Sequence, residues 1–543
     1  MPLLPRRPAV GLGLSFVIGT GLGLTLDVST ALIAAAAVAG WLAAAMVAWA
    51  VRSLTGRGSA AASVLIHLSI LLTAWIAVPM HPSDFPAGAA LLAELDGQSL
   101  QVVGIVAGDP DAELAQEDKG LRRWKFPLEP LQVSCNGRIC PFPGRMMVMW
   151  LGAKGSRPPT YGEQWVLSGN ARVFPPSGMR RKKLYLTITP GHRHLLFADQ
   201  GGWFAQHCYE ARRAAANYLA IGIRDFPLET GILQSLILGY RERLTDPMAE
   251  LFKASGTLHI FAISGSHVVV ICALIVFVLI ALRIPRKLWA LFVVPLLSAY
   301  TLGTGGEPSA VRACIMGIVY VLGPTLGRKA DAPSALALSA VLILAWSPSQ
   351  LFEAGFVCSF AVVIGLIVLC PLFDRPLRKL CEPDPLRQQA ESRRVVFLRW
   401  LGRQASALLA LNLAAWIAST PLTAYYFGRF TPISLVSNFL VIPVSALALV
   451  AGCLSMLLGP CVSLAADVFN HANLFLMSVL VGSMQALLKI PGGSILIAPW
   501  PLWAVALWYV GVAAGVLWLR GGVIREYRSS VAGDGDPPSG VEC

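Results

Sequence analysis

The sequence predicts a polytopic α-helical membrane protein of about twelve spans with one small all-β soluble domain inserted between them. Of its 543 residues, 55% are hydrophobic and only 13% are charged, whereas a soluble protein carries roughly a quarter charged residues. Many apolar runs approach the roughly 20 residues that a helix needs to cross a bilayer. A single polar segment, residues 97–189, interrupts these runs and shows the alternating pattern of strands.

Three spans are predicted before the polar segment, at residues 9–26, 31–51 and 61–80. The first follows Arg6 and Arg7 and so resembles a signal peptide, but a second apolar run begins at Ala31, which favours a retained span. The loop between the second and third spans holds Arg52 and Arg57. Because cytoplasmic loops collect Lys and Arg, this loop and the N-terminus are expected in the cytoplasm, and residue 81 outside.

The polar segment contains five short runs with the strand period of two, separated by turns such as Asn136–Gly137. Five strands in about 90 residues predict a small barrel or sandwich, and an OB-type barrel fits this count. Cys135 and Cys140 flank the Asn–Gly turn on the side that the topology places outside the cytoplasm. Because that compartment is oxidising, the two cysteines are predicted to form a disulfide.

Basic residues exceed acidic ones in this segment, with 14 Lys and Arg against nine Asp and Glu between Asp96 and Gln200. The densest cluster is Arg180, Arg181, Lys182 and Lys183. A basic groove with aromatic side chains suits single-stranded nucleic acid. A solvated charge run near anionic lipid is an equally good interpretation of the same residues.

The remainder of the chain is expected to be helical and mostly membrane-embedded. Residues 203–219 have one apolar face, which predicts an amphipathic helix on the membrane surface, and residues 228–238 form a short apolar helix. Nine further spans are predicted at residues 258–282, 288–302, 309–326, 334–346, 354–373, 405–426, 433–458, 472–488 and 500–519.

Basic residues fall on alternate loops of this helical half, notably in the long loop at residues 374–404, which supports an even number of spans with both termini in the cytoplasm. The predicted organisation is an N-terminal helical region (residues 1–82), an extracytoplasmic OB-like domain (83–200), amphipathic interfacial helices (201–252), a channel-type helical domain (253–524) and a disordered cytoplasmic tail (525–543).

Few ionisable side chains lie in or beside the spans, and such residues commonly line a substrate path or form a buried pair. The stretch from Ser255 to Val268 holds His259 and His267, with a Ser264–Gly265 pair that can loosen a helix. Arg312 and Glu353 lie farther along the chain. They either contribute to a path or pair with each other to hold two helices together.

Two kinds of chemistry are conceivable for the histidine-containing stretch. Ser264 and His267 have a spacing that allows contact on a helix, as an intramembrane serine hydrolase requires, but no orienting carboxylate is evident nearby. His259 and His267 are about 12 Å apart along a regular helix, too far to share a metal ion unless the helix breaks. The chain has no GxxxxGK[ST] phosphate loop and no His/Asp cluster typical of a metal-dependent nuclease. We therefore expect no enzyme activity, no metal and no cofactor.

Several separate motifs resemble the ComEC competence family, the inner-membrane DNA-uptake channels. The family signature, roughly GT-x-H-x-x-AISG-x-H, matches Gly256, Thr257, His259, Ala262, Ile263, Ser264, Gly265 and His267. Its PS-x-x-RA-x-x-M helix matches Pro308, Ser309, Arg312, Ala313 and Met316, and Glu353 occupies the acidic position of its L-x-[DE]-x-GF-x-x-S run. Asn438 lies in the later N-x-x-x-IP element. The resemblance runs from about Gly231 to Leu449 and is weaker before that.

The resemblance implies a channel that passes single-stranded DNA inward across the cytoplasmic membrane during natural transformation. It implies as partners membrane lipids, an extracytoplasmic DNA receptor and a cytoplasmic DNA translocase. Many members end in a metallo-β-lactamase-like nuclease domain, which is not expected here, so degradation would fall to a separate nuclease. The candidate path residues are His259, Ser264, Gly265, His267, Arg312, Glu353 and Asn438. The rivals are a transporter of another solute and a hydrolase using Ser264.

Overall fold

The structure is a computed structural model. It describes residues 8–25, 67–68, 70–74, 95–113, 121–135, 137–140, 142, 146–153, 157, 159–174, 183–188, 193–198, 200–261, 263–327, 331–379 and 392–533. Helix α1 (Pro8–Thr25) corresponds to the first predicted span. The second predicted span and most of the third lie outside the described residues. The chain divides into two compact units: Met1–Phe360 with Thr431–Ser494, and Ala361–Phe430 with Ile495–Cys543.

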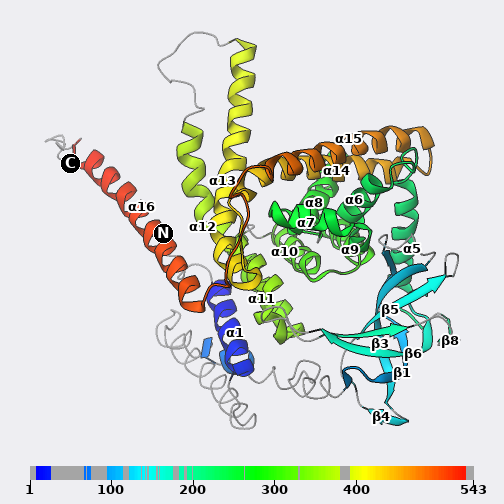
Figure 1. Ribbon diagram of the computed structural model, residues 1–543. Coiled ribbons are helices and arrows are strands. Elements are labelled where there is room, and N and C mark those ends of the chain that lie inside the picture. The colour runs from blue at the N-terminus through cyan, green and yellow to red at the C-terminus, as the bar shows by residue number, and fades with distance from the viewer. Residues whose placement is uncertain are drawn as a thin grey trace. The chain divides into compact units, whose positions relative to one another are not determined.

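The β domain is a small closed barrel of five strands, coloured cyan in Figure 1. The strands are β1 (Ser99–Val106), β3 (Leu121–Cys135), β5 (Met146–Ala153), β6 (Gln164–Phe174) and β7 (Lys183–Ile188). Their order is β1-β3-β5-β7-β6, and β6 pairs with β1 to close the barrel. The β5–β7 pair is parallel and the other four pairs are antiparallel. This order is compatible with the OB-fold and confirms the predicted five-stranded domain.

The barrel core follows from the alternating pattern of its strands. Strand β1 buries Leu100, Val102, Gly104 and Val106, whereas the alternate residues Gln101, Val103 and Ile105 are more exposed. Phe126 and Trp150, from β3 and β5, fill the interior, with ring centroids 6.2 Å apart. Short strands β2 (Asp111–Glu113) and β4 (Arg138–Cys140) extend β3, and β8 (Arg193–Phe197) extends β6.

The predicted disulfide between Cys135 and Cys140 does not form in the structure, where both thiols are free. The register of the β3–β4 hairpin explains this, because Cys135 lies opposite Arg138 and Cys140 lies opposite Val133. The two cysteines are therefore not directly opposed across the hairpin. The Cys135 thiol instead donates a hydrogen bond to Oε1 of Gln98, at 2.9 Å.

Eight of the described helices in the first unit contribute to one apolar core. They are α5 (Trp203–Tyr218), α6 (Pro227–Leu238), α7 (Asp246–Ala254), α8 (Gly265–Ala281), α9 (Trp289–Gly303), α10 (Pro308–Thr325), α14 (Ser434–Leu458) and α15 (Ser463–Leu487). The same unit also contains α11 (Ala332–Trp346) and the start of α12 (Ala354–Lys379). Helices α14 and α15 run alongside each other, as Figure 1 shows in orange.

Helix α6 lies in this core, whereas residues 201–252 are expected from the sequence to form amphipathic interfacial helices. Every residue from Thr230 to Leu238 is buried, and α6 packs against both α14 and α15. The physical reason is that α6 is apolar on all sides, a pattern typical of a buried helix. The preceding helix α5 is amphipathic, as predicted, and it packs against α9 through a face that buries Cys208, Arg212 and Ala216.

All nine helices predicted after residue 258 are present, and six of the described helices are long and apolar enough to cross a membrane: α10, most of α12, α13, α14, α15 and the first half of α16. Helices α8 and α11 and part of α1 are apolar but shorter. The predicted total of about twelve spans is thus not confirmed.

The second unit contains most of α12, α13 (Arg393–Phe427), α16 (Leu502–Gly533) and a short pair of strands, β9 (Arg429–Phe430) and β10 (Ile495–Leu496). Leu369, Ala414 and Val516 join its three helices in a small core. Helix α16 continues to Gly533, past residue 525 where the disordered tail is expected to begin, and residues 534–543 lie outside the described residues. No proline interrupts the sequence there before Pro537, which allows the helix to extend beyond the apolar span.

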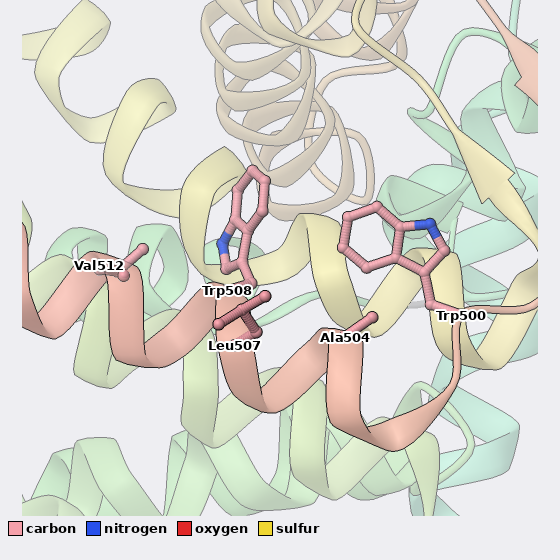
Figure 2. A pocket seen from close by; sticks show the side chains of 6 residues that line it. Trp500, Ala504, Leu507, Trp508 and Val512 are labelled. Atoms are coloured by element: carbon pink, nitrogen blue, oxygen red, sulfur yellow. The ribbon is translucent and has the colours of Figure 1, made fainter.

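A pocket of about 510 Å³ lies along α16 in this unit (Figure 2). It is lined by Trp500, Ala504, Leu507, Trp508, Gly511 and Val512. Trp508 is held by a hydrogen bond from its Nε1 to the Ile417 carbonyl, at 3.0 Å. The lining is apolar and includes no candidate site residue.

Candidate functional site

The signature stretch is a break between two helices. Helix α7 ends at Ala254, residues Leu258–Phe261 form a single 3-10 turn, and α8 begins only at Gly265. Gly256 adopts φ +74°, and a Cβ there would lie 2.6 Å from the Cβ of Ser434, so the turn requires glycine. The break separates His259 from His267, which therefore do not share one regular helix.

His267 is almost fully buried, with 2% of its surface exposed. The Ser264 backbone N–H donates to its Nδ1 at 3.3 Å, so the neutral imidazole carries its proton on Nε2. This Nε2 is buried and has no hydrogen-bond partner among the described residues. His259 is exposed, and its ring pairs with the Gly256 carbonyl at 3.2 Å. In the described part of the chain, no group of three His, Cys, Asp or Glu residues could hold a metal ion.

The Ser264 hydroxyl does not contact the His267 ring as a nucleophile contacts its base. Its Oγ lies 2.6 Å from the Oγ of Ser266, and the ring nitrogen that could accept a proton already accepts the Ser264 N–H. A serine hydrolase needs a hydrogen bond from the nucleophile to the base. This geometry gives no support to the hydrolase alternative.

The start of α10 is attached to the signature stretch by hydrogen bonds. The Ser309 hydroxyl donates to the Ile263 carbonyl at 3.1 Å. Arg241, which precedes α7, donates through Nε to the Phe261 carbonyl at 3.2 Å. Its Nη2 also lies 3.3 Å from a carboxylate oxygen of Glu307, the residue that caps α10. The N-terminal ends of α8 and α10 are therefore held side by side.

Arg312 lies on α10 and is 3% exposed. Its Nη2 donates to the Ser359 hydroxyl on α12 at 3.2 Å, whereas its Nε and Nη1 have no partner among the described residues. The guanidinium also touches Gly355 in the first turn of α12, where a Cβ would lie 3.0 Å from Nη2. Glu353 is exposed, and within the described ranges no ion pair joins it to Arg312. The direct Arg312–Glu353 pair is thus not present.

Three helices therefore begin in one region: α8 at Gly265, α10 at Pro308 and α12 at Ala354. A Cβ on Gly265 would lie 3.7 Å from the Cβ of Ala313 on α10, and Arg312 bridges α10 to the first turns of α12. The first backbone N–H groups of a helix have no intrahelical partner, and the helix dipole makes this end positive. The site is consequently rich in hydrogen-bond donors and in positive potential.

The other candidate residues are less closely tied to this region. Asn438 lies on α14, partly buried, and its Oδ1 has no partner among the described residues. Arg180, Arg181 and Lys182 lie outside the described residues, as does the side chain of Lys183 at the start of β7. The DNA-contacting role of this basic cluster stays a prediction.

One polar cluster was not singled out from the sequence. Asp109, in the barrel loop after β1, has a side chain that is 1% exposed, and Arg213 donates to it from α5 at 2.8 Å. Arg212 also reaches it, at 3.7 Å, and the Tyr240 hydroxyl donates to it at 3.2 Å. The guanidinium groups of Arg212 and Arg243 lie 3.9 and 4.0 Å from the Tyr240 ring centroid. This cluster joins the barrel to the helical core, and its members are up to 134 residues apart in the sequence.

The fold and the site define a class: a multi-helix membrane protein with a small β-barrel and a buried basic site at broken helices. Comparison with known families identifies the particular one. The Competence protein family model matches residues 236–521, more than half of the chain, which therefore belongs to that family. ComE operon protein 3 of Bacillus subtilis (strain 168) is 31% identical over 226 residues, covering 42% of this chain and 26% of that protein. The chain thus matches about a quarter of that relative's length. No solved structure matches the chain.

Proposed function

We propose that this chain forms the channel through which single-stranded DNA crosses the cytoplasmic membrane during DNA uptake. Membership of the competence family supports a role in DNA uptake. The observation that carries the finer proposal is Arg312, a buried cation on an apolar helix whose Nε and Nη1 are unpaired among the described residues. Ionisable groups at membrane depth commonly mark a substrate path, and a guanidinium fits the charge and geometry of a phosphate.

The proposal includes an orientation. We place both termini in the cytoplasm and the barrel outside, because the Arg-rich loops then fall on the cytoplasmic side. The barrel, whose strand order is compatible with an OB-fold, is proposed to contact the incoming strand. An extracytoplasmic receptor would deliver the DNA, a cytoplasmic translocase would draw it inward, and a separate nuclease would degrade the other strand.

Two rival functions are weaker. A transporter of another solute would also carry buried polar groups, but competence-family membership favours DNA. The hydrolase alternative requires a bond from the Ser264 hydroxyl to His267, and the hydroxyl contacts Ser266 instead.

DNA uptake by a deletion strain tests the proposal. We expect the deletion to leave binding of labelled duplex DNA at the cell surface intact, to abolish appearance of labelled single strands in the cytoplasm, and to abolish transformation. A plasmid copy of the intact chain should restore both. A deletion strain that transforms normally would disprove the proposed function. Normal transformation with impaired uptake of a small solute would favour the transporter.

A further inference from the structure

We propose that the N-terminal ends of α8, α10 and α12, together with Arg312, form a binding site for a single phosphodiester group of the strand in transit. This inference rests on the proposed function, because it assigns the ligand of the same region. It adds the chemical group that is recognised, the helix ends that recognise it and the side chain whose unpaired donors bind it.

The charge balance of the region is the first argument. Each of the three helix ends carries a positive partial charge of about half an elementary charge. The Arg312 guanidinium is buried against one of these ends, at Gly355, and like charges placed together in a poorly solvated site repel. Glu353 and Glu307 lie near enough to attract the guanidinium, but neither forms an ion pair with it among the described residues: Glu353 is exposed and Glu307 pairs with Arg241. A bound anion would neutralise the positive charge of the guanidinium and the helix ends.

The unpaired donors are the second, independent argument. Nε and Nη1 of Arg312 are buried N–H donors without a partner in the described part of the chain. Buried polar groups are nearly always paired, so unpaired ones call for an explanation. The same guanidinium lies against the first turn of α12, at Gly355. A ligand that satisfies these donors must offer hydrogen-bond acceptors.

A phosphodiester meets both requirements. It carries one negative charge, its unesterified oxygens accept hydrogen bonds and donate none, and guanidinium groups and helix ends are its usual protein partners. The hydroxyls of Ser264 and Ser266 lie at the N-terminal end of α8 and hydrogen-bond each other, so one of the two keeps an O–H that can donate as well. Gly355 keeps the first turn of α12 open to the guanidinium, because a Cβ there would fall 3.0 Å from Nη2.

The test measures binding to the full chain purified in detergent micelles, by equilibrium dialysis. The probes are thymidylyl-thymidine, which has one phosphodiester, its uncharged methylphosphonate analogue, and inorganic phosphate. We expect the phosphodiester to bind and the methylphosphonate not to bind. Arg312→Leu should weaken phosphodiester binding by about tenfold or more. Arg312→Lys should weaken it less, because lysine keeps the positive charge but lacks the planar guanidinium that donates two parallel hydrogen bonds. The matched control is Arg286→Leu, which removes an exposed arginine and should change nothing.

The variants and arms separate the possible outcomes. Gly355→Ala keeps the arginine charge but crowds its Nη2 atom, so it should also weaken phosphodiester binding. This second variant tests the site even if Arg312→Leu fails to fold. Equal binding by Arg312→Leu and the intact chain, or by the methylphosphonate and the phosphodiester, would overturn the site. Binding of inorganic phosphate alone would reassign it to free phosphate and overturn the DNA assignment. If the deletion strain still takes up DNA while the purified chain binds the phosphodiester, the proposed function is wrong but the phosphodiester-binding site stands.

Discussion

Arg312 has an environment that is unusual for a charged residue at membrane depth. Arg312 is 3% exposed, and its one hydrogen bond among the described residues goes to the neutral Ser359 hydroxyl. A buried ion pair held only for structure would place a carboxylate against the guanidinium. Glu353 is exposed and forms no ion pair with Arg312 among the described residues, which leaves a role in the DNA path as the proposal to test against a role in joining helices.

Substitutions at Arg312 should distinguish a role in the DNA path from a role in joining helices, and the assay is transformation. Arg312→Leu is expected to abolish transformation while the protein remains in the membrane, because a phosphate in the path loses its cation. Arg312→Lys should retain part of the activity if charge is what matters. Adding Glu353→Gln to Arg312→Leu should give no rescue, since the two side chains are not paired. Restored transformation in that double variant would contradict the prediction and make Arg312 a structural residue.

At the scale of elements, the Asp109 cluster is the joint between the barrel and the helices. Asp109 lies between β1 and β2, Arg212 and Arg213 lie on α5, and Tyr240 follows α6. Its buried carboxylate accepts hydrogen bonds from Arg213 and Tyr240, and Arg212 donates in addition to the Leu238 carbonyl at 2.9 Å. The hydrogen bonds and charges of both elements are satisfied together only when the barrel is docked in this position.

Removing this carboxylate should destabilise the protein markedly. Asp109→Ala leaves Arg212 buried without its anion, and breaking a buried charge pair in this way costs about 3–5 kcal/mol. The measurement is the midpoint of thermal unfolding in detergent. Asp225→Ala, which removes an exposed aspartate, is the matched control. Combining Asp109→Ala with Arg212→Leu should recover part of the loss; an Asp109→Ala midpoint equal to that of the control would show that the cluster is not a structural joint.

At the scale of the whole molecule, orientation in the membrane decides which side the strand enters from. Arg378, near the end of α12, is exposed, and the proposed topology places it in the cytoplasm. Ile139, on β4 of the barrel, is 70% exposed and is placed outside. These two positions therefore report opposite sides of the membrane.

A membrane-impermeant maleimide should distinguish the sides in intact cells. In a chain with Cys135, Cys140 and Cys461 replaced by serine, we expect labelling at Ile139→Cys and none at Arg378→Cys. Permeabilised cells should show labelling of both variants, and the serine-substituted chain without either introduced cysteine should show neither signal. Labelling of Arg378→Cys alone in intact cells would invert the topology.

The chain is also expected to pass DNA without cutting it. The sequence shows no His/Asp cluster typical of a metal-dependent nuclease. Purified protein incubated with end-labelled single-stranded and duplex DNA should leave both intact, with Mg²⁺ or Mn²⁺ present or absent. Metal-dependent cleavage that follows this chain through successive purification steps would contradict the expectation.

The sequence by itself determined the membrane class, the five-stranded domain and the helices after residue 258. The physical reason is that apolar run length and strand alternation are local properties, set by bilayer thickness and by the geometry of a pleated strand. It also identified the candidate residues, because ionisable side chains are rare in apolar spans and so stand out. The Ser264–Gly265 pair correctly marked the point where the helix breaks.

Only the tertiary structure decided which of these residues meet. Arg312 approaches Ser359 and Gly355 across 47 and 43 residues of chain, and Asp109 meets Tyr240 across 131, and no local pattern encodes such pairings. The β3–β4 register kept Cys135 and Cys140 apart although their spacing suggested a bond. Helix α6 lies in the core because α14 and α15 cover it on more than one side. Contacts of this kind depend on how distant segments pack, and packing is a property of the folded chain as a whole.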